Sequence, residues 1–150
     1  MNSSNYTATV NKISLLRERT SVIKSKISSS IDIARFTRQL YNGSISIYES
    51  FYIVLLNNAN ETIGFVEISK GGITGTLVDV RILVKHALEG LATSVILAHN
   101  HPSGQTRPSQ ADKEITAKVK NALTLFDIKV LDHIILTETD YLSFADEGIL

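Results

Sequence analysis

The stretch SVILAHNHPSG, residues 94–104, decides how this chain folds and where its chemistry lies. After Ser94, residues 95–98 form a short, continuous apolar run in which Val95 and Ile96 are β-branched. Such a run is typical of a strand that is covered on both faces of a sheet. We therefore expect a buried strand over residues 94–98 that leads directly into His99.

Helical and strand patterns alternate along the rest of the chain. Apolar residues at three- and four-residue steps predict helices at 31–41 with Ser30 as N-cap, at 82–91 after Asp79, and at 109–126. Runs rich in apolar and β-branched residues predict further strands at 2–13, 51–56, 62–68, 128–136 and 141–144. The polar, basic segment 14–28 is expected to form an arm or loop. The alternation predicts an α/β fold, with a mixed sheet and helices on its faces.

The composition fits one globular domain. The chain has 150 residues, of which 43% are hydrophobic and 20% are charged, values that argue against disorder and coiled coil. No apolar run approaches the roughly 20 residues of a membrane-spanning helix, and the polar N-terminus lacks a signal-peptide core, so we expect a cytoplasmic protein without membrane association. Cysteine is absent, which leaves His, Asp and Glu as the strong side-chain metal ligands.

The charge is balanced overall but unevenly distributed. Residues 1–50 contain seven Lys and Arg against three Asp and Glu, whereas the remaining residues are acidic overall. A basic region can contact nucleic acid, but these charges are widely spread and have no aromatic residues interleaved among them. Nucleic-acid binding is therefore an open alternative that the charge pattern does not favour.

The segment after the buried strand has the spacing of a metal chelate. His99 and His101 are two residues apart, so in extended backbone their imidazoles project to the same side. A loop with both prolines of the chain follows, after which Ser109 begins a helix and places Asp112 in its first turn. Two imidazoles and one carboxylate give three protein ligands, and a tetrahedral zinc site then keeps one position open for water.

Each half of this pattern also has a structural explanation. Surface loops carry His-x-His pairs by chance, and Ser109 with Asp112 three residues later is an ordinary helix start. The conjunction is harder to explain structurally, because the acid lies across a shaped loop directly after a buried strand, where α/β sheets usually present ligands.

The order His99-x-His101, seven residues, then Ser109-x-x-Asp112 resembles the JAMM signature of the JAB/MPN metalloprotease-like domains. The segments HNHPSG, PSQAD, LDHIIL and SFADEGIL are similar to the RadC branch of that family, and the resemblance runs from Phe51 to Leu150. It implies a three-layer α/β/α architecture of the cytidine deaminase-like kind. It also implies a RadC-like JAB/MPN domain over 46–150, with 1–45 as an N-terminal strand or arm and helix.

The resemblance further implies a zinc-dependent hydrolase of peptide or isopeptide bonds. His99, His101 and Asp112 would hold one Zn²⁺ per chain, and the metal-bound water would be the nucleophile. Glu67, in the segment FVEISKGG, would be the general acid/base, and the Ser109 hydroxyl would donate to the oxyanion. The partner would be a peptide or protein substrate of unknown identity, and the oligomeric state stays open.

Two other functions remain as alternatives. RadC proteins carry a DNA-repair label, which suggests a DNA-associated accessory factor. Many RadC-like proteins have a DNA-binding helix-hairpin-helix module before this domain, whereas residues 1–50 here show one clear helix and no paired glycine-rich hairpin. Some MPN relatives have lost their ligands and serve as non-catalytic interaction modules. This chain keeps every position of the motif, so the interaction module ranks last.

Two further histidines are expected to lie outside the ligand set. His133 falls in a predicted strand, and we expect it to be buried and hydrogen-bonded rather than to act as a fourth ligand. His86 is expected to be solvated on its helix. Ser103 and Gly104 are expected to shape the loop, and the sequence does not decide whether Arg107 contacts substrate or water.

Overall fold

The structure is a computed structural model that describes residues 17–71 and 77–150, so the strand predicted at 2–13 lies outside the described residues. The elements in chain order are α1 (Ser30–Arg38), η1 (Gln39–Tyr41), β1 (Ser50–Leu56), β2 (Thr62–Lys70), α2 (Val80–Glu89), β3 (Ser94–Asn100), α3 (Gln110–Thr124), β4 (Lys129–Leu136) and β5 (Tyr141–Ser143). None of the helices in these two ranges is long and apolar enough to cross a membrane.

The five strands form one mixed sheet in the order β2-β1-β3-β4-β5. Strand β3 occupies the centre, where it pairs antiparallel with β1 and parallel with β4. All seven residues of β3 are buried, which confirms the prediction of a strand covered on both faces. The sheet is mixed because β1 pairs antiparallel with both β2 and β3, and β5 pairs antiparallel with β4, whereas β4 joins β3 in parallel through the α3 crossover.

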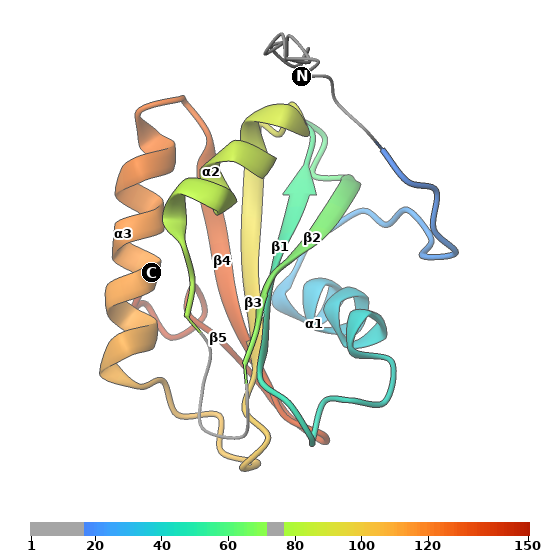
Figure 1. The fold of residues 1–150 in the computed structure, drawn as a ribbon, viewed down its shortest axis with the longest axis vertical. Coiled ribbons are helices and arrows are strands. Elements are labelled where there is room, and N and C mark those ends of the chain that lie inside the picture. The colour runs from blue at the N-terminus through green and yellow to red at the C-terminus, as the bar shows by residue number, and fades with distance from the viewer. Residues whose placement is uncertain (1–16, 72–76) are drawn as a thin grey trace, which may run out of the picture.

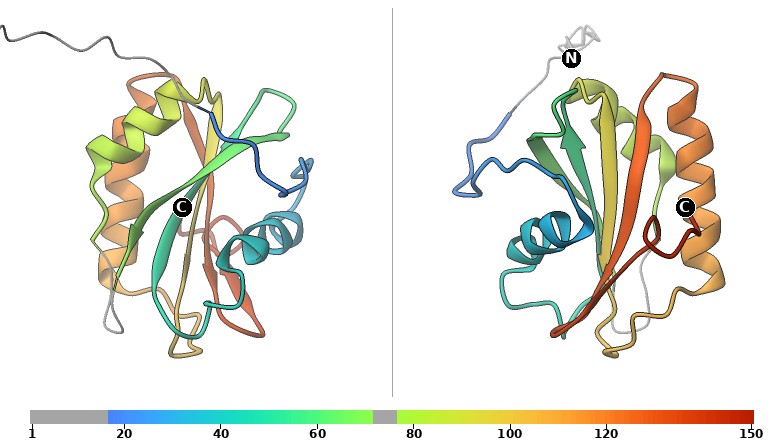
Figure 2. Two further views of the ribbon diagram at one scale, coloured as in Figure 1. Left: turned by 45° about the vertical axis from the view of Figure 1, so that its right-hand side comes forward. Right: turned by 180° about the vertical axis from the view of Figure 1, so that it is seen from behind.

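Helices cover both faces of the sheet and produce three layers (Figures 1 and 2). Helix α1 packs on one face, and α2 and α3 pack together on the other. Side chains alternate along β1, with Tyr52 in the core beneath α1 and Phe51 in the core beneath α2 and α3. This arrangement confirms the predicted α/β fold.

The beginning of α1 differs from the prediction by one residue. Ser29, not Ser30, is the N-cap, because its hydroxyl accepts from the amide of Asp32 and its extended backbone precedes the first helical turn. The helical turns then tighten into η1 before Asn42 adopts a left-handed φ of 41°, which ends the helical segment where the Asn42-Gly43 pair predicts.

A one-residue irregularity interrupts the pairing of β3 with β4. Val95 pairs with Val130, but Ile96 pairs with Asp132, which leaves Leu131 without a partner in the register. As a result Leu131 packs against the core beneath α1, whereas His133, two residues later, contacts Thr116 of α3 on the opposite face. The irregularity therefore decides on which face of the sheet His133 lies.

Candidate metal centre

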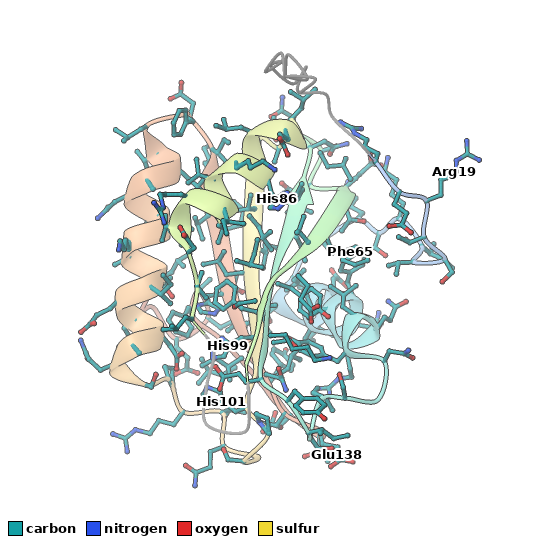
Figure 3. The ribbon with its side chains drawn as sticks, in the orientation of Figure 1. Arg19, Phe65, His86, His99, His101 and Glu138 are labelled. Carbon is teal, nitrogen blue, oxygen red and sulfur yellow. The ribbon has the colours of Figure 1, made fainter. Side chains whose placement is uncertain are left out.

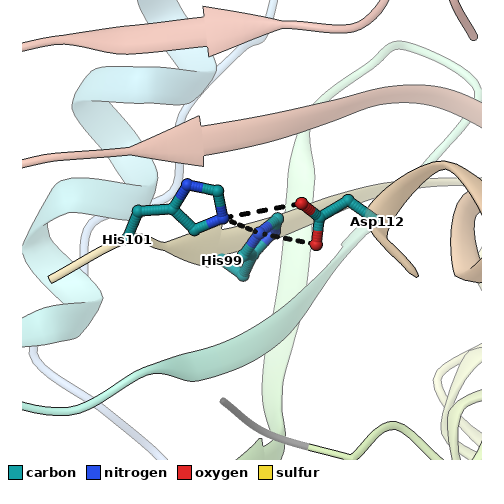
Figure 4. A group of neighbouring side chains, drawn as sticks. All are labelled: His99, His101 and Asp112. Carbon is teal, nitrogen blue, oxygen red and sulfur yellow. Dashed lines mark hydrogen bonds and ion pairs between the residues drawn. The ribbon is translucent and has the colours of Figure 1, made fainter. Parts of the chain in front are cut away.

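The two histidines and the aspartate predicted as ligands converge at the C-terminal end of β3 (Figures 3 and 4). His99 Nε2 lies 2.9 Å from His101 Nε2 and 3.2 Å from Asp112 Oδ1, and His101 Nε2 lies 3.5 Å from Asp112 Oδ2. Within residues 17–71 and 77–150, this is the one group of three or more such side chains close enough to hold a metal ion. The structure thus brings a possible three-ligand set together from a strand end and a helix start.

The spacing of these atoms fits one divalent ion. Two ligands at tetrahedral positions, each about 2.0 to 2.1 Å from zinc, are roughly 3.3 Å apart. The observed separations of 2.9, 3.2 and 3.5 Å lie on both sides of that value. His101 Nδ1 lies 2.7 Å from the carbonyl oxygen of Gln105, which can only accept, so the ring proton belongs on Nδ1 and the Nε2 lone pair faces the other ligands.

A capping box holds the Asp112 carboxylate. The Ser109 amide and hydroxyl both donate to Asp112 Oδ2, at 2.7 and 2.6 Å, and the Asp112 amide donates back to the Ser109 hydroxyl at 3.1 Å. Oδ1 is left to face His99 Nε2. The structural and the functional interpretations of Ser109 and Asp112 are therefore compatible, because the contacts that begin the helix also orient the candidate ligand.

The electrostatics of the cluster favour an ionised Asp112. Partial burial by itself would raise the pKa of Asp112, but its interactions with His101, His99 and Ser109 outweigh burial and hold that pKa far below its usual range. In return, the hydrogen bond to Asp112 raises the pKa of His101 above 6.5 despite burial, and the charge of Glu49 adds a small effect in the same direction. A concentrated negative charge is what a bound cation requires.

The candidate ligands open onto a pocket of about 610 Å³. His99, His101, Ser109 and Asp112 lie on one part of its lining, and Glu49 also borders it. The other lining residues are mainly apolar: Phe51, Leu77, Val78, Ala111 and Ile115. A substrate could therefore reach the ligands from solvent, and it would meet a second carboxylate there.

Glu67 does not lie beside these ligands, and its predicted position is wrong. Its side chain is exposed, and its Oε1 accepts a hydrogen bond of 3.1 Å from the hydroxyl of Tyr52. Glu67 also pairs with Tyr52 across β1 and β2, and Tyr52 belongs to the core beneath α1. Directly paired residues share a face, so Glu67 projects to the side of the sheet opposite His99.

The carboxylate that borders the pocket belongs instead to Glu49, which the sequence analysis missed. Glu49 directly precedes β1 and lies two residues before Phe51, the residue that pairs with His99. Its carbonyl oxygen accepts from the amide of Gly71 at 2.8 Å, which continues the β1–β2 pairing by one step. The period-two alternation of β1 could have identified it, had the predicted strand begun before Phe51.

Asn100, between the two histidines, secures the segment that carries Glu49. It is fully buried on the face opposite the ligands. Its Oδ1 accepts from the Ser50 amide at 2.8 Å, and its Nδ2 donates to the carbonyl oxygens of Ile45 and Tyr48 at 2.6 and 2.7 Å. These three bonds attach the chain before β1 to the end of β3, so Glu49 and the histidines keep a fixed relation.

The other histidines lie outside the ligand group. His133 is completely buried and contacts His99 and Thr116, which confirms that it is a hydrogen-bonded core residue. His86 is partly exposed on α2, toward the other end of the molecule in Figure 3. In the loop, Gly104 has a φ of 82° and its amide donates to the His101 carbonyl, which fits its predicted shaping role, while Arg107 is exposed.

Comparisons with known proteins agree with this architecture. The family model described as RadC-like JAB domain matches residues 27–149. A UPF0758 protein of Flavobacterium johnsoniae is 57% identical over 102 residues, which cover 68% of this chain and 44% of that protein. A UPF0758 protein of Porphyromonas gingivalis is 43% identical over 103 residues, covering 68% and 45%.

A third relative extends the match further along the chain. A UPF0758 protein of Shewanella denitrificans is 39% identical over 141 residues, which cover 93% of this chain and 61% of that protein. The chain thus spans about half the length of the curated relatives it matches. From the family match and these identities, the chain belongs to the RadC-like JAB domain family.

Proposed function

We propose that this chain is a zinc-dependent hydrolase of peptide or isopeptide bonds. The observation that carries the proposal is the convergence of His99, His101 and Asp112 in a pocket that also holds Glu49. Three protein ligands leave one position of a tetrahedral ion free, which is the pattern of catalytic rather than structural zinc sites. The proposal rests on the site, since a shared fold alone would not imply an activity.

Glu49 and Ser109 would have different roles in such a reaction. When bound, zinc supplies a Lewis acid that makes water a nucleophile at neutral pH. The Glu49 carboxylate borders the pocket from the position just before β1, where it could take a proton from the attacking water and return it to the leaving amine. In the structure the Ser109 hydroxyl donates to Asp112. During the reaction this hydroxyl would rotate and donate instead to the oxyanion that develops beside the ligands.

Two carboxylates on opposite faces of the sheet provide the test. The zinc-loaded Glu49→Gln variant should lose about a hundredfold to ten-thousandfold in kcat, the usual contribution of a general acid/base. The matched Glu67→Gln variant should retain wild-type kcat, because Glu67 contacts Tyr52 on the other face. Hydrolysis of peptide and isopeptide libraries would be followed by mass spectrometry, with zinc content measured in each sample.

Two outcomes would contradict the proposal. One is that zinc-loaded wild-type protein cleaves no member of either library faster than chelator-treated protein does. The other is that Glu49→Gln and Glu67→Gln keep equal activity at equal zinc content, which would remove Glu49 from the reaction.

A further inference from the structure

A buried hydrogen-bond relay runs from His99 away from the pocket and through two side chains that the proposed reaction does not use. We propose that His133 and Thr116 are positioning residues that fix the tautomer of His99, so that its Nε2 lone pair is presented to a metal ion. The inference rests on the proposed metal site but not on the proposed hydrolysis.

The relay is continuous and enclosed. His99 Nδ1 lies 2.8 Å from His133 Nε2, and His133 Nδ1 lies 2.6 Å from the Thr116 hydroxyl oxygen. The Thr116 hydroxyl in turn contacts the carbonyl oxygen of Asp112. His99, His133 and Thr116 are at most 3% exposed, so water does not compete for these bonds.

The direction of the relay follows from the single proton on the Thr116 hydroxyl. The Asp112 carbonyl oxygen can only accept, so that proton points to it, and the hydroxyl oxygen must then accept from His133 Nδ1. With its proton on Nδ1, a neutral His133 offers a lone pair at Nε2, which accepts from His99 Nδ1. His99 Nε2 is thereby left without a proton.

The surroundings keep His133 neutral and in place. His133 is completely buried, and its two nitrogens face the His99 ring and the Thr116 hydroxyl rather than a carboxylate, which disfavours a doubly protonated ring that could not accept from His99. The rings of Phe51 and Phe144 lie 5.4 and 4.7 Å from the His133 ring, measured between centroids, so His133 is packed between apolar neighbours. The nitrogens therefore have His99 and Thr116 as their partners.

The relay also connects two candidate ligands. It begins on His99 of β3, crosses to β4 through His133, and ends on the backbone of Asp112 at the start of α3. The consequence at the site is that three acceptors, His99 Nε2, His101 Nε2 and the Asp112 carboxylate, face one another within 3.5 Å. These acceptors need a cation or a shared proton among them. Because the relay keeps His99 Nε2 unprotonated, it favours binding of a metal ion at this position.

Thr116→Val tests the relay, because valine matches the shape of threonine but lacks its hydroxyl. The zinc Kd, measured by competition with a chelator at fixed pH, should rise about tenfold to a hundredfold, as when outer partners of metal-binding histidines are removed. Thr116→Ser keeps the hydroxyl and should restore the Kd to near the wild-type value. Nitrogen NMR of metal-free wild-type protein should show the His99 proton on Nδ1, and Thr116→Val should weaken that preference.

Thr124→Val is the matched control. Thr124 lies on the same helix and donates to the carbonyl oxygen of Lys120, four residues earlier, as Thr116 does to Asp112, but it is exposed and contacts no histidine among the described residues. It should leave the zinc Kd unchanged. Thermal melting of the metal-free variants separates a loss of folding from a loss of affinity.

The result that would overturn the inference is an equal zinc Kd for folded Thr116→Val, Thr116→Ser and wild-type protein. If Thr116→Val does not fold, a wild-type spectrum with the His99 proton on Nε2 would overturn it as well. Absence of zinc binding by wild-type protein would refute both this inference and the proposed function. Zinc binding with the expected differences but without hydrolysis would refute the proposed function alone.

Discussion

Two helices of this protein begin with the same local pattern, Ser-x-x-Asp, on opposite faces of one sheet. At α1, the Asp32 Oδ2 accepts from the Ser28 amide and the Ser29 hydroxyl, both at 3.0 Å. At α3, the Asp112 Oδ2 accepts from the Ser109 amide and hydroxyl at 2.7 and 2.6 Å. At the start of its helix, each aspartate thus accepts hydrogen bonds from a serine hydroxyl and a backbone amide.

The difference lies in what the second carboxylate oxygen meets. Among the described residues, the hydrogen bonds of the Asp32 side chain go to Ser28 and Ser29 alone. Asp112 follows the loop that leaves β3, and its Oδ1 faces His99 while Oδ2 also lies within 3.5 Å of His101. A capping aspartate becomes a candidate ligand through its position at a strand end, not through a different local motif.

The largest expected difference between the two aspartates is in zinc affinity after each is replaced with asparagine. Asp112→Asn removes the charge from the ligand group, and we expect the zinc Kd to rise more than about a hundredfold, beyond the effect usual for outer partners. Asp32→Asn should leave zinc binding unchanged, since α1 lies on the face of the sheet opposite the ligand group and the Asp32 carboxylate bonds to Ser28 and Ser29. Isothermal titration with zinc measures both; a similar Kd for the two variants would remove Asp112 from the ligand set.

Acidification should distinguish the same two aspartates. The hydrogen bond to Asp112 raises the pKa of His101, because the carboxylate favours the protonated ring. Below that pKa a proton occupies the zinc ligand, so the zinc affinity should fall about tenfold for each pH unit. In metal-free protein, Asp112→Asn should lower the His101 midpoint followed by NMR, whereas Asp32→Asn should not move it. An unchanged His101 midpoint in Asp112→Asn would contradict the interaction between His101 and Asp112.

The smallest expected difference is between the two N-cap serines, again in zinc affinity. Ser109→Ala and Ser29→Ala each remove an N-cap hydroxyl, and each should lower the free energy of unfolding by about 1 kcal/mol. Only Ser109→Ala should weaken zinc binding, by about tenfold, because Ser109 also orients the Asp112 carboxylate. Urea unfolding and zinc titration measure the two effects; equal zinc affinities would mean that the cap does not position the ligand.

The sequence was sufficient where a local pattern and the tertiary structure impose the same requirement. The SVILA run predicts β3 because a central strand is buried on both faces, and His99 and His101 share a side because extended backbone alternates with period two. The conversion of a helix cap into a candidate ligand was also predictable, since the proline-containing loop after β3 leads directly to Ser109.

The acid beside the histidines could not be chosen by local pattern alone. Glu67 stands in a clear strand followed by a glycine pair, whereas Glu49 stands at the end of a connecting segment with no strong signal of its own. What brings Glu49 to the pocket is the pairing of β1 with β3 and the three hydrogen bonds of Asn100, both of which are long-range. The choice of Ser30 over Ser29 was a smaller error of the kind expected at helix ends.

The unpaired Leu131 in β4 has a consequence for any redesign or natural variation of this chain. Deleting Leu131 would restore a regular ladder in which Val130 still pairs with Val95 and His133 still pairs with Leu97, so both residues would keep their faces. If instead the pairing slipped so that Leu131 stood opposite Ile96, the later side chains of β4 would change faces, and His133 would turn away from His99. A one-residue slip of β4 would thus uncouple the architecture of this domain from its affinity for metal, whereas loss of the extra residue would leave His133 in register with β3.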